Sequence, residues 1–440
     1  MNNFTFKDIL TQYKNKHYVE DEVEYKQVTV SKQGTVSFRG TKKGIEIGRK
    51  RQYVIDLKNN PYTLIFTRQG IYDGAIGMAP NEVDCAVVTE NMPMFNVNTE
   101  KIHPEYLIHY LNSKEFKKSL DTIVPSGTAQ KSIHERQFIN LPINIPKMEN
   151  QSKIVNLLNA FFEKRNLFEN QITFQLEHAS KLRQSILQDA VQGKLTTQNP
   201  KDNAKELLKK IETEKQKLIK EKKIKSEKPL SEISKDEIPF EIPENWVWCK
   251  LGDICNKITD GTHHSPKNYE NGDVMYVTAK NIKPWGIDLT GITYVSAKDH
   301  DEIYSRCDPE FGDILYIKDG ATTGIVTLNN LNDRFSMLSS VALLKTGEYI
   351  ENKFLKYLMS SPYFYNYVRE DMTGVAITRV TLIKLKKTKL PLPPLEEQQR
   401  IVQKVDELME LCDELEQNIE KSKNYSEMLM QSVLQEAFKN

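Results

Sequence analysis

An apolar residue recurs every three or four positions over two long stretches of the chain. The first stretch runs from Glu149 to Gln192 without glycine or proline, and the second begins after Pro394 and keeps the same register. A repeat of 3.5 residues over four heptads is typical of a coiled-coil seam, and each helix would run about 66 Å. We therefore predict two long helices that pack on each other. Their predicted seam residues are Ile154, Leu158, Phe161, Ile172 and Leu182 in the first helix and Ile401, Val405, Leu408, Leu415 and Ile419 in the second.

The second long stretch repeats the first at an offset of 247 residues. Gln151 recurs as Gln398, and sixteen of the 65 positions between 127 and 191 are identical to their shifted partners, where chance would give roughly four. Further upstream the same offset places Ser113 on Ser360. A period this long is one domain plus one long helix used twice, unlike the short period of a solenoid.

About 140 residues with a different pattern of apolar and polar positions precede each long helix. Short β-rich runs at 62–66 and 313–317 are followed by glycine-containing turns, and one amphipathic helix is expected around 106–120 or 354–367. These features predict two compact mixed α/β domains, and hence an α+β fold.

The composition excludes some classes of function but does not identify a single one. The chain has 61 basic and 60 acidic residues, so its net charge is +1 and any basic surface must be local. Its five cysteines form no Cys-x-x-Cys pair and are expected to be reduced thiols. We find no signal-peptide pattern and no run of 18 apolar residues, and we expect a cytoplasmic protein that does not contact the membrane.

Residues 201–228 form a lysine-rich segment between the two repeats. They include eleven lysines and six acidic residues, and a polar tether follows up to residue 239. A solvated helix and linker is the first interpretation, and a phosphate-contacting arm is the second.

Four segments of the chain carry a resemblance to a known family. They are Gln188-Asp189-Ala190-Val191-Gln192-Gly193-Lys194-Leu195, then Phe240-Glu241-Ile242-Pro243-Glu244-Asn245-Trp246 ahead of Leu251-Gly252-Asp253-Ile254, then Phe311-Gly312-Asp313-Ile314-Leu315, and finally Leu390-Pro391-Leu392-Pro393-Pro394-Leu395-Glu396-Glu397-Gln398-Gln399-Arg400-Ile401-Val402. In this order, within a two-fold repeat, they resemble the DNA-specificity (S) subunits of type I restriction-modification systems over nearly the whole chain. The first domain departs from the pattern, because it lacks the Pro-x-x-Trp lead-in and has Pro61-Tyr62-Thr63-Leu64-Ile65 where Gly-Asp-Ile-Leu is expected.

The resemblance implies a specific architecture. It consists of two target-recognition domains in a pseudo-two-fold tandem repeat, joined by two long helices packed as an antiparallel coiled coil. The predicted boundaries are 1–145 for the first target-recognition domain, 146–195 for the central long helix, 196–240 for the charged helix and linker, 241–390 for the second target-recognition domain and 391–440 for the C-terminal long helix.

The candidate DNA contacts fall in polar loops and basic hairpins. Reading bases requires donors and acceptors, and contacting phosphates requires cations or backbone amides. In the second domain the resemblance favours His264, Lys267, Lys280, Asn281, Lys318 and Thr323. In the first domain the densest basic region outside the linker includes Lys32, Gln33, Arg39, Lys43, Arg49, Arg51 and Arg68. Two further pairs, Gln130 with Lys131 and Thr378 with Arg379, sit in equivalent loops of the two repeats. Ordinary solvated polar loops are the alternative for each.

Enzyme motifs are incomplete. The segment 59–62 approaches the Asn-Pro-Pro-Tyr of adenine methyltransferases, but it lacks the second proline and a nearby glycine-rich cofactor turn. The Glu-x-Lys spacing at 115–117 falls on an amphipathic helix and lacks a Pro-Asp companion. There is no phosphate-binding loop, and His263-His264 has no second ligand cluster for a metal. We therefore expect a non-catalytic subunit.

Two packed antiparallel helices would relate the domains they carry by a pseudo-two-fold axis that matches the dyad of DNA. Because the domains have diverged, the expected target is a split, asymmetric site. The resemblance implies double-stranded DNA, two methyltransferase (M) subunits and restriction (R) subunits as partners in phage defence. S-adenosylmethionine, ATP and Mg are then expected on those partners and not on this chain. The alternative is a coiled-coil protein-interaction scaffold without DNA specificity. A single-chain methyltransferase or nuclease is disfavoured by the missing motifs.

Overall fold

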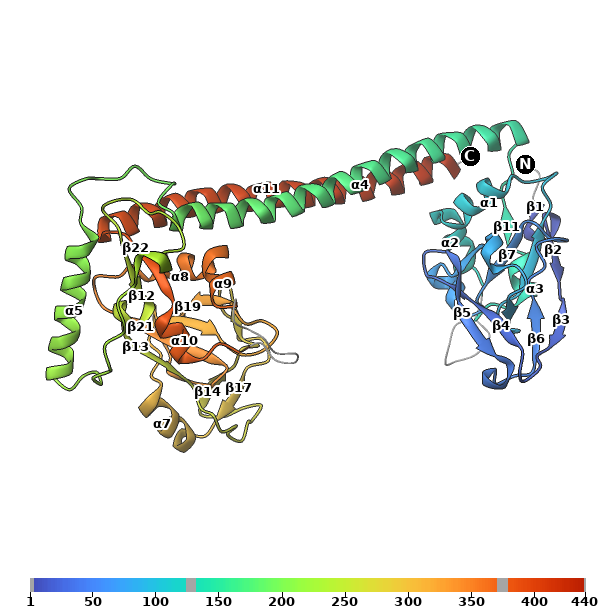
Figure 1. Ribbon diagram of the computed structural model, residues 1–440. Helices are drawn as coiled ribbons and strands as arrows, with labels where there is room; N and C mark the ends of the chain where they lie inside the picture. Colours follow the sequence, from blue (N-terminus) through green and yellow to red (C-terminus); the bar gives the residue numbers. More distant parts are fainter. Residues whose placement is uncertain (1–3, 124–131, 370–378, 439–440) are drawn as a thin grey trace. The chain divides into compact units, whose positions relative to one another are not determined.

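The computed structural model of the protein describes residues 4–123, 132–369 and 379–438. The chain divides into two compact units, unit 1 (Met1–Phe174 with Ile419–Asn440) and unit 2 (Gln175–Asn418) (Figure 1). Each unit combines a mixed helix-and-strand domain with a part of two long helices, α4 (Met148–Val191) and α11 (Leu395–Phe438). The predicted α+β class, with two mixed domains and two long helices, is confirmed.

Unit 1 is built around a four-stranded antiparallel sheet, its main sheet. In hydrogen-bonding order the strands are β2 (Leu10–Tyr13), β10 (Met94–Val97), β7 (Thr63–Phe66) and β8 (Ile76–Met78). A second pair of strands and three helices complete the domain: β1 (Phe4–Thr5), β11 (Pro142–Ile143), α1 (Pro104–Leu111), α2 (Lys114–Asp121) and α3 (Glu135–Ile139). Leu434 and Phe438 of α11 join the same hydrophobic core as Phe6, Phe66 and Phe138. The end of the second long helix is therefore part of the first domain's core.

Unit 2 has a main sheet of the same order and an equivalent second pair of strands. Its main sheet has the order β13 (Cys255–Asp260), β21 (Val341–Thr346), β18 (Ile314–Ile317) and β19 (Val326–Leu328). The accompanying elements are β12 (Val247–Lys250), β22 (Lys389–Leu392), α6 (Leu251–Ile254), α8 (Asn352–Ser360), α9 (Pro362–Tyr367) and α10 (Leu382–Lys387). All four residues of β7 and all four of β18 are buried. The first domain thus has the expected strand although it lacks the Gly-Asp-Ile-Leu motif.

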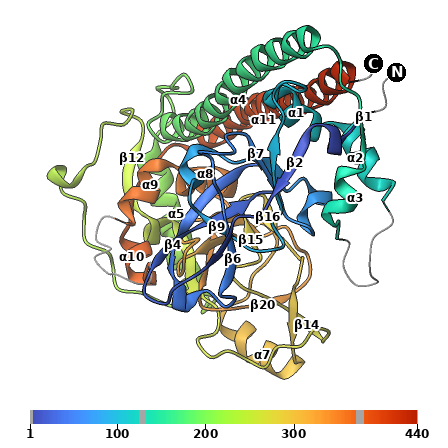
Figure 2. The ribbon, with the colours of Figure 1, turned by 90° about the vertical axis from the view of Figure 1, so that its right-hand side faces the viewer.

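The units differ in the sheet that covers the other face of the main sheet. In unit 1 this second sheet has five strands, in the order β3 (Lys16–Tyr18), β6 (Arg51–Val54), β9 (Val87–Val88), β4 (Glu24–Val30) and β5 (Val36–Lys43). Figure 2 labels β4, β6 and β9 of this sheet. In unit 2 it has three strands, a separate hairpin and one helix: β17 (Thr293–Val295), β14 (Val274–Val277), β20 (Phe335–Met337), β15 (Ile282–Lys283), β16 (Gly286–Ile287) and α7 (Ala297–Arg306). The duplication is therefore retained in the main sheet and lost in the second one.

The amphipathic helix expected in each domain is two helices. Ser113 follows the end of α1 and caps α2, with its Oγ accepting from the backbone N–H of Phe116 at 3.2 Å. Ser361 does the same for α9, accepting from Phe364 at 3.3 Å. A serine cap satisfies an amide that the helix cannot pair internally, and so marks a helix start. Ser113 is thus equivalent to Ser361 and not to Ser360, and the repeat offset upstream is 248 residues.

The two long helices run in opposite directions in unit 2. Arg183 of α4 bonds Glu416 of α11 at 2.9 Å and pairs with Asp413, while Thr196, just beyond the end of α4, bonds Glu397 near the start of α11. As the residue number rises along α4, the number of the contacting residue on α11 falls.

The predicted seam consists of two rows, each with residues seven positions apart along a helix. In one row the predicted residues Leu158, Ile172, Val405 and Ile419 are each at most 6% exposed, and Ala179, Ile186 and Cys412 in the same register are also buried. In the other row, Ile401 is buried and Ile154, Phe161 and Leu408 are half-buried. Leu182 and Leu415 were predicted in this row but are 47% and 43% exposed. A straight α-helix drifts by about 20° per heptad from a 3.5-residue repeat, so a pair of helices does not keep both rows facing inward.

The lysine-rich segment between the repeats contains α5 (Ala204–Lys220). Its residues Leu207 and Ile211 are buried in the core of unit 2. The expectation of a solvated helix is therefore wrong for this face of α5.

Candidate nucleic-acid interface

Ionic side chains converge at one edge of the main sheet of unit 2, where β13 and β18 end. Asp260 closes β13 and Lys318 directly follows β18; both are at most 3% exposed. The Lys318 Nζ lies 2.8 Å from an Asp319 carboxylate oxygen and 3.4 Å from Asp260. Asp260 also pairs with Arg306 and with the His263 ring, whose Nε2 is 3.3 Å away. We call these residues, with Arg379, the edge cluster.

The edge cluster orients two exposed guanidinium groups. Buried charges must be paired, because removing them from water costs several kcal/mol each. Lys318 lies between the carboxylates of Asp260 and Asp319 and neutralises only one of their two negative charges. The remaining negative charge attracts cations from the surface. Arg306, whose side chain is 49% exposed, pairs with Asp260, and Arg379, 61% exposed, pairs with Asp319 at 3.3 Å. A buried core thereby fixes two surface cations of the kind that bind phosphate or guanine.

Three of the DNA contacts predicted for unit 2 are buried and support the loops from inside. Lys318 is 2% exposed within the edge cluster. Asn281 is 6% exposed; its Oδ1 accepts from the Thr278 amide at 3.0 Å, and its Nδ2 donates to the Asp288 carbonyl. Thr323 is 2% exposed and donates to the Gly320 carbonyl at 2.7 Å. These side chains bond within their own loops, since a polar loop can use its polar groups to hold its own backbone. That they contact DNA stays a prediction.

The remaining predicted residues of unit 2 lie at the surface. His264, Lys267 and Lys280 are exposed, and the Lys267 ammonium lies 5.2 Å from the centre of the Tyr269 ring. Thr378 lies outside the described residues. Arg306 and Asp260 were missed, because Arg306 ends a helix and Asp260 ends a strand, without a motif around either.

Unit 1 places its predicted residues on two features. Lys43, Arg49 and Arg51 are exposed but paired with acids: Lys43 with Glu22 at 3.5 Å, and both arginines with Glu90 at 3.3 Å. Arg39 and Gln33 are exposed. These residues belong to the second sheet and its turns. They therefore lie in the part of the fold in which the two units differ.

The second feature of unit 1 is a depression of about 520 Å³ where β7 ends. This edge corresponds to the edge cluster of unit 2. It is lined by residues 67–70 with Tyr72, Asp73 and Asn91. Lys32 pairs with Asp73 at 3.0 Å, whereas Arg68 is largely buried against Glu135 at 2.6 Å. Arg68 therefore holds this loop through Glu135, and its contact with DNA stays a prediction. Gln130 and Lys131 lie outside the described residues.

The start of each long helix is fixed to its domain by an equivalent buried glutamine. Gln398 is fully buried; its Oε1 accepts from the Glu351 amide at 2.8 Å, and its Nε2 donates to the Pro393 carbonyl at 3.1 Å. Gln151, 1% exposed, accepts from the His103 amide at 2.7 Å and donates to the Pro146 carbonyl at 2.9 Å. Glu351 and His103 are the N-caps of α8 and α1. Gln398 therefore ties α11 to α8, and Gln151 ties α4 to α1.

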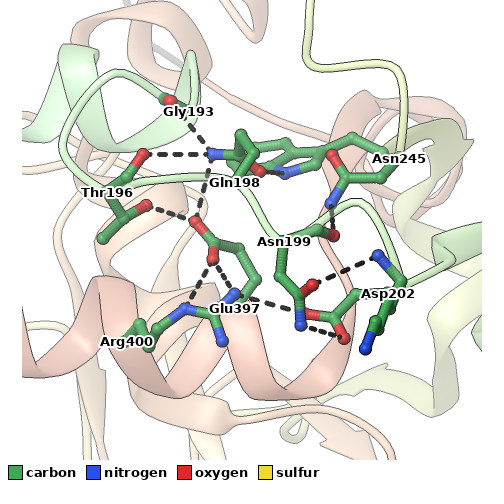
Figure 3. A network of polar contacts seen from close by, with 10 residues as sticks. Gly193, Thr196, Gln198, Asn199, Asp202, Asn245, Glu397 and Arg400 are labelled. Carbon is green, nitrogen blue, oxygen red and sulfur yellow. Dashed lines mark hydrogen bonds and ion pairs between the residues drawn. The ribbon is translucent and has the colours of Figure 1, made fainter.

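Unit 2 has an additional polar network at this junction (Figure 3). Glu397 is fully buried in the first turn of α11. Its carboxylate accepts hydrogen bonds from the Thr196 hydroxyl and, at 3.2 Å, from the side-chain Nε2 of Gln198. Arg400 pairs with Glu397 and reaches Asp202 at 3.2 Å. The network joins the segment that follows α4 to the beginning of α11.

The described residues include no group of three His, Cys, Asp or Glu side chains that could hold a metal ion. Within the same residues, no helix has both the length and the apolar character that crossing a membrane requires.

Comparison with known proteins identifies relatives that match most of the chain. The chain is 29% identical over 375 residues to the specificity subunit of the type I restriction enzyme EcoAI from Escherichia coli, an alignment that covers 73% of this chain and 62% of that protein. It is 24% identical over 327 residues to the MjaVIII specificity subunit of Methanocaldococcus jannaschii, covering 72% and 67%. The chain thus spans less than two thirds of the EcoAI subunit.

Solved structures share the fold. A chain from a type I R-M system, determined to explain complex assembly and conformational transition, superimposes with a TM-score of 0.66 at 20% identity, covering 99% of this chain and 96% of that chain. The HsdS subunit from Thermoanaerobacter tengcongensis gives 0.54 at 18% identity, with the same coverage. The family model described as the type I restriction modification DNA specificity domain matches residues 1–178 and 243–422. Because these matches cover most of the chain, once for each repeat, the protein belongs to the type I restriction-modification DNA specificity family.

Proposed function

We propose that this chain is the DNA-binding specificity subunit of a type I restriction-modification complex, in which each domain reads one half of a split, asymmetric site. The observation that carries the proposal is the uneven divergence of the two repeats. The main sheet, its helices and the buried glutamines recur, whereas the second sheets differ in strand number and order. A duplicated frame with different exposed surfaces suits two half-sites of different sequence.

In this proposal the edge cluster and the exposed loops beside it contact DNA in unit 2. Arg306 and Arg379 supply cations, and His264, Lys267 and Lys280 supply exposed donors. In unit 1 the corresponding candidates are Lys32, Gln33, Arg39, Lys43, Arg49 and Arg51, all of them exposed. The long helices set the distance between the half-sites.

The long helices also carry the proposed docking surface for two M subunits. In unit 1 several large apolar side chains of these helices are exposed: Leu157, Leu167, Phe174, Tyr425, Met428 and Leu429. Large exposed apolar patches are a mark of protein interfaces. Replacing Tyr425 and Met428, each 68% exposed, with Asp should abolish co-purification with the M subunit. The same change at exposed Lys421 and Lys423 is the control, and equal loss in both variants would contradict this surface.

Catalysis is assigned to the partners. We propose that the M subunits bind S-adenosylmethionine and methylate adenine, and that R subunits add ATP- and Mg-dependent cleavage. The complex would act in the cytoplasm, where the chromosome and incoming phage DNA are found.

Mapping modified adenines across a genome tests the proposed function. Cells that make this chain with its M subunit should show a two-part motif with a fixed gap, and cells lacking only this chain should lose it. Unchanged methylation would favour the alternative, a coiled-coil interaction scaffold without DNA specificity.

The contact residues are tested by the binding of a duplex that carries the mapped motif. Arg379→Gln should weaken binding by roughly 10- to 100-fold, the value of one or two good contacts. Arg334→Gln, at another exposed arginine of unit 2, should leave it unchanged. Equal effects of the two changes would remove Arg379 from the interface.

A further inference from the structure

The lysine-rich helix α5 is fixed to the domain of unit 2 along one face. Ala204, Leu207 and Ile211 are at most 7% exposed, and the Ala204 amide donates to the Asn245 carbonyl at 2.9 Å. Near the other end, the Lys215 ammonium donates to the Gly252 carbonyl at 2.7 Å. Burial lowers the pKa of Lys215. The helix is held at both ends, so its outer face has a defined direction.

The outer face of α5 is basic. At 3.6 residues per turn its exposed lysines fall within about 140° of the helix circumference, opposite the buried residues. They are Lys205, Lys209, Lys210, Lys217 and Lys220. None of these five ammonium groups forms an ion pair with a described residue. The segment 201–228 carries eleven lysines and six acidic residues in a chain whose net charge is +1.

The C-terminal part of α5 lies beside the main sheet of unit 2. A cavity of about 310 Å³ separates α5 and the following segment from β13, the outermost strand of the main sheet. Ile219, Ile224 and Lys225 line one side of it, and Cys255 and Ile258 line the other. Because β13 ends at Asp260, the C-terminal part of α5 lies beside the strand that leads to the edge cluster.

The chemistry of this face fits a polyanion better than a protein partner. Protein interfaces favour aromatic residues, methionine and arginine, and are depleted in lysine. The outer face of α5 has lysines together with Glu206, Thr213 and Gln216, and no exposed apolar side chain. Lysines without base-reading groups neutralise phosphates and carry no sequence information.

We propose that α5 binds the phosphate backbone of duplex DNA beside the half-site read by unit 2, adding affinity but no sequence preference. This inference rests on the proposed function.

The test compares two triple variants in the complex with the M subunit. K209Q/K217Q/K220Q removes three charges from the basic face, and K58Q/K118Q/K147Q removes three exposed lysines from unit 1. Lysine and glutamine have similar helix propensities, so α5 should stay folded, and an unchanged thermal unfolding profile verifies this. Binding is measured between 50 and 300 mM salt with a duplex carrying the motif mapped in vivo and with a scrambled duplex.

We expect the slope of log affinity against log salt concentration to be less steep by about 2 to 3 in the α5 variant, since each phosphate contact contributes about 0.9 to this slope. Its affinity should fall by the same factor for both duplexes, leaving the ratio between them unchanged. The unit 1 variant should keep the slope of the unmodified chain. An unchanged slope in the α5 variant overturns the inference, and so does loss of the M subunit with an unchanged slope, which would assign the face to a protein partner. If the unmodified chain fails to distinguish the two duplexes, the proposed function itself fails.

Discussion

Replacing Gln398 with methionine removes the two hydrogen bonds that tie α11 to α8 while keeping the size of the side chain. The Glu351 amide and the Pro393 carbonyl, now bonded at 2.8 and 3.1 Å, lose their partner at a position with no exposed surface. A buried polar group without a partner costs about 1–3 kcal/mol. The added burial of apolar atoms offsets part of this cost, so we expect a loss of about 2–4 kcal/mol in unit 2.

Gln151→Met is the matched change in unit 1. It leaves the His103 amide and the Pro146 carbonyl without the same two bonds, and also removes a bond to the Lys101 carbonyl at 3.2 Å. The loss in unit 1 should therefore be at least as large. Gln399→Met is the control, since Gln399 is exposed on the same turn as Gln398.

Hydrogen exchange followed by mass spectrometry measures these effects in each unit separately, which a single unfolding curve of a two-unit chain does not. Peptides from the start of α8 should exchange faster in Gln398→Met, and peptides from the start of α1 in Gln151→Met. Protection of the other unit should stay as it is. A loss below about 0.5 kcal/mol, or equal effects in Gln398→Met and Gln399→Met, would refute the tethering role.

Three further changes test the packing, the edge cluster and the histidines at positions 109 and 300. Val405→Asp, at a fully buried seam position, should destabilise unit 2 by more than about 3 kcal/mol, whereas Leu415→Asp, at a position 43% exposed, should cost less than about 1 kcal/mol, as measured by hydrogen exchange in peptides of unit 2. Lys318→Met leaves two carboxylates without their buried cation and should cost about 3–5 kcal/mol by the same measurement; a neutral result would mean that the pairing contributes nothing. Burial lowers the pKa of His109 and of His300. Because the unfolded chain then binds protons more readily, stability should be present above about pH 6.5 and be lost as the pH falls below it, and His300→Gln should flatten this dependence in unit 2.

The long helices and the duplication could be predicted because both are local or periodic signals. The 3.5-residue spacing is visible within a single stretch of sequence, and the repeat is visible without any knowledge of contacts. The seam was predicted less well, since Leu182 and Leu415 follow the heptad but lie outside the buried row. Which of two apolar rows faces inward depends on the partner helix and on helix geometry.

The candidate interface was harder to predict, because burial depends on contacts between distant residues. Lys318 follows a buried strand and is followed by Asp319 and Gly320, a pattern that is typical of an exposed loop lysine. Its burial results from Asp260, which lies 58 positions earlier in the sequence, and from the strand pairing that brings the two together. The second sheets posed the same difficulty: β9 has two residues and pairs in parallel with β4, 60 positions away at Gln27 and Val87.

The main sheets provide a physical reason for the uneven divergence of the units. Side chains alternate between the two faces of a strand, so in β18 Ile314 and Tyr316 enter the core that includes the long helices, while Leu315 and Ile317 enter a separate core under the second sheet. In β7, Leu64 and Phe66 likewise face one core and Ile65 faces another. Substitutions under a second sheet therefore leave the helix-bearing core intact. A surface built on that sheet can change while the frame that carries it stays the same, as two recognition domains with different targets would require.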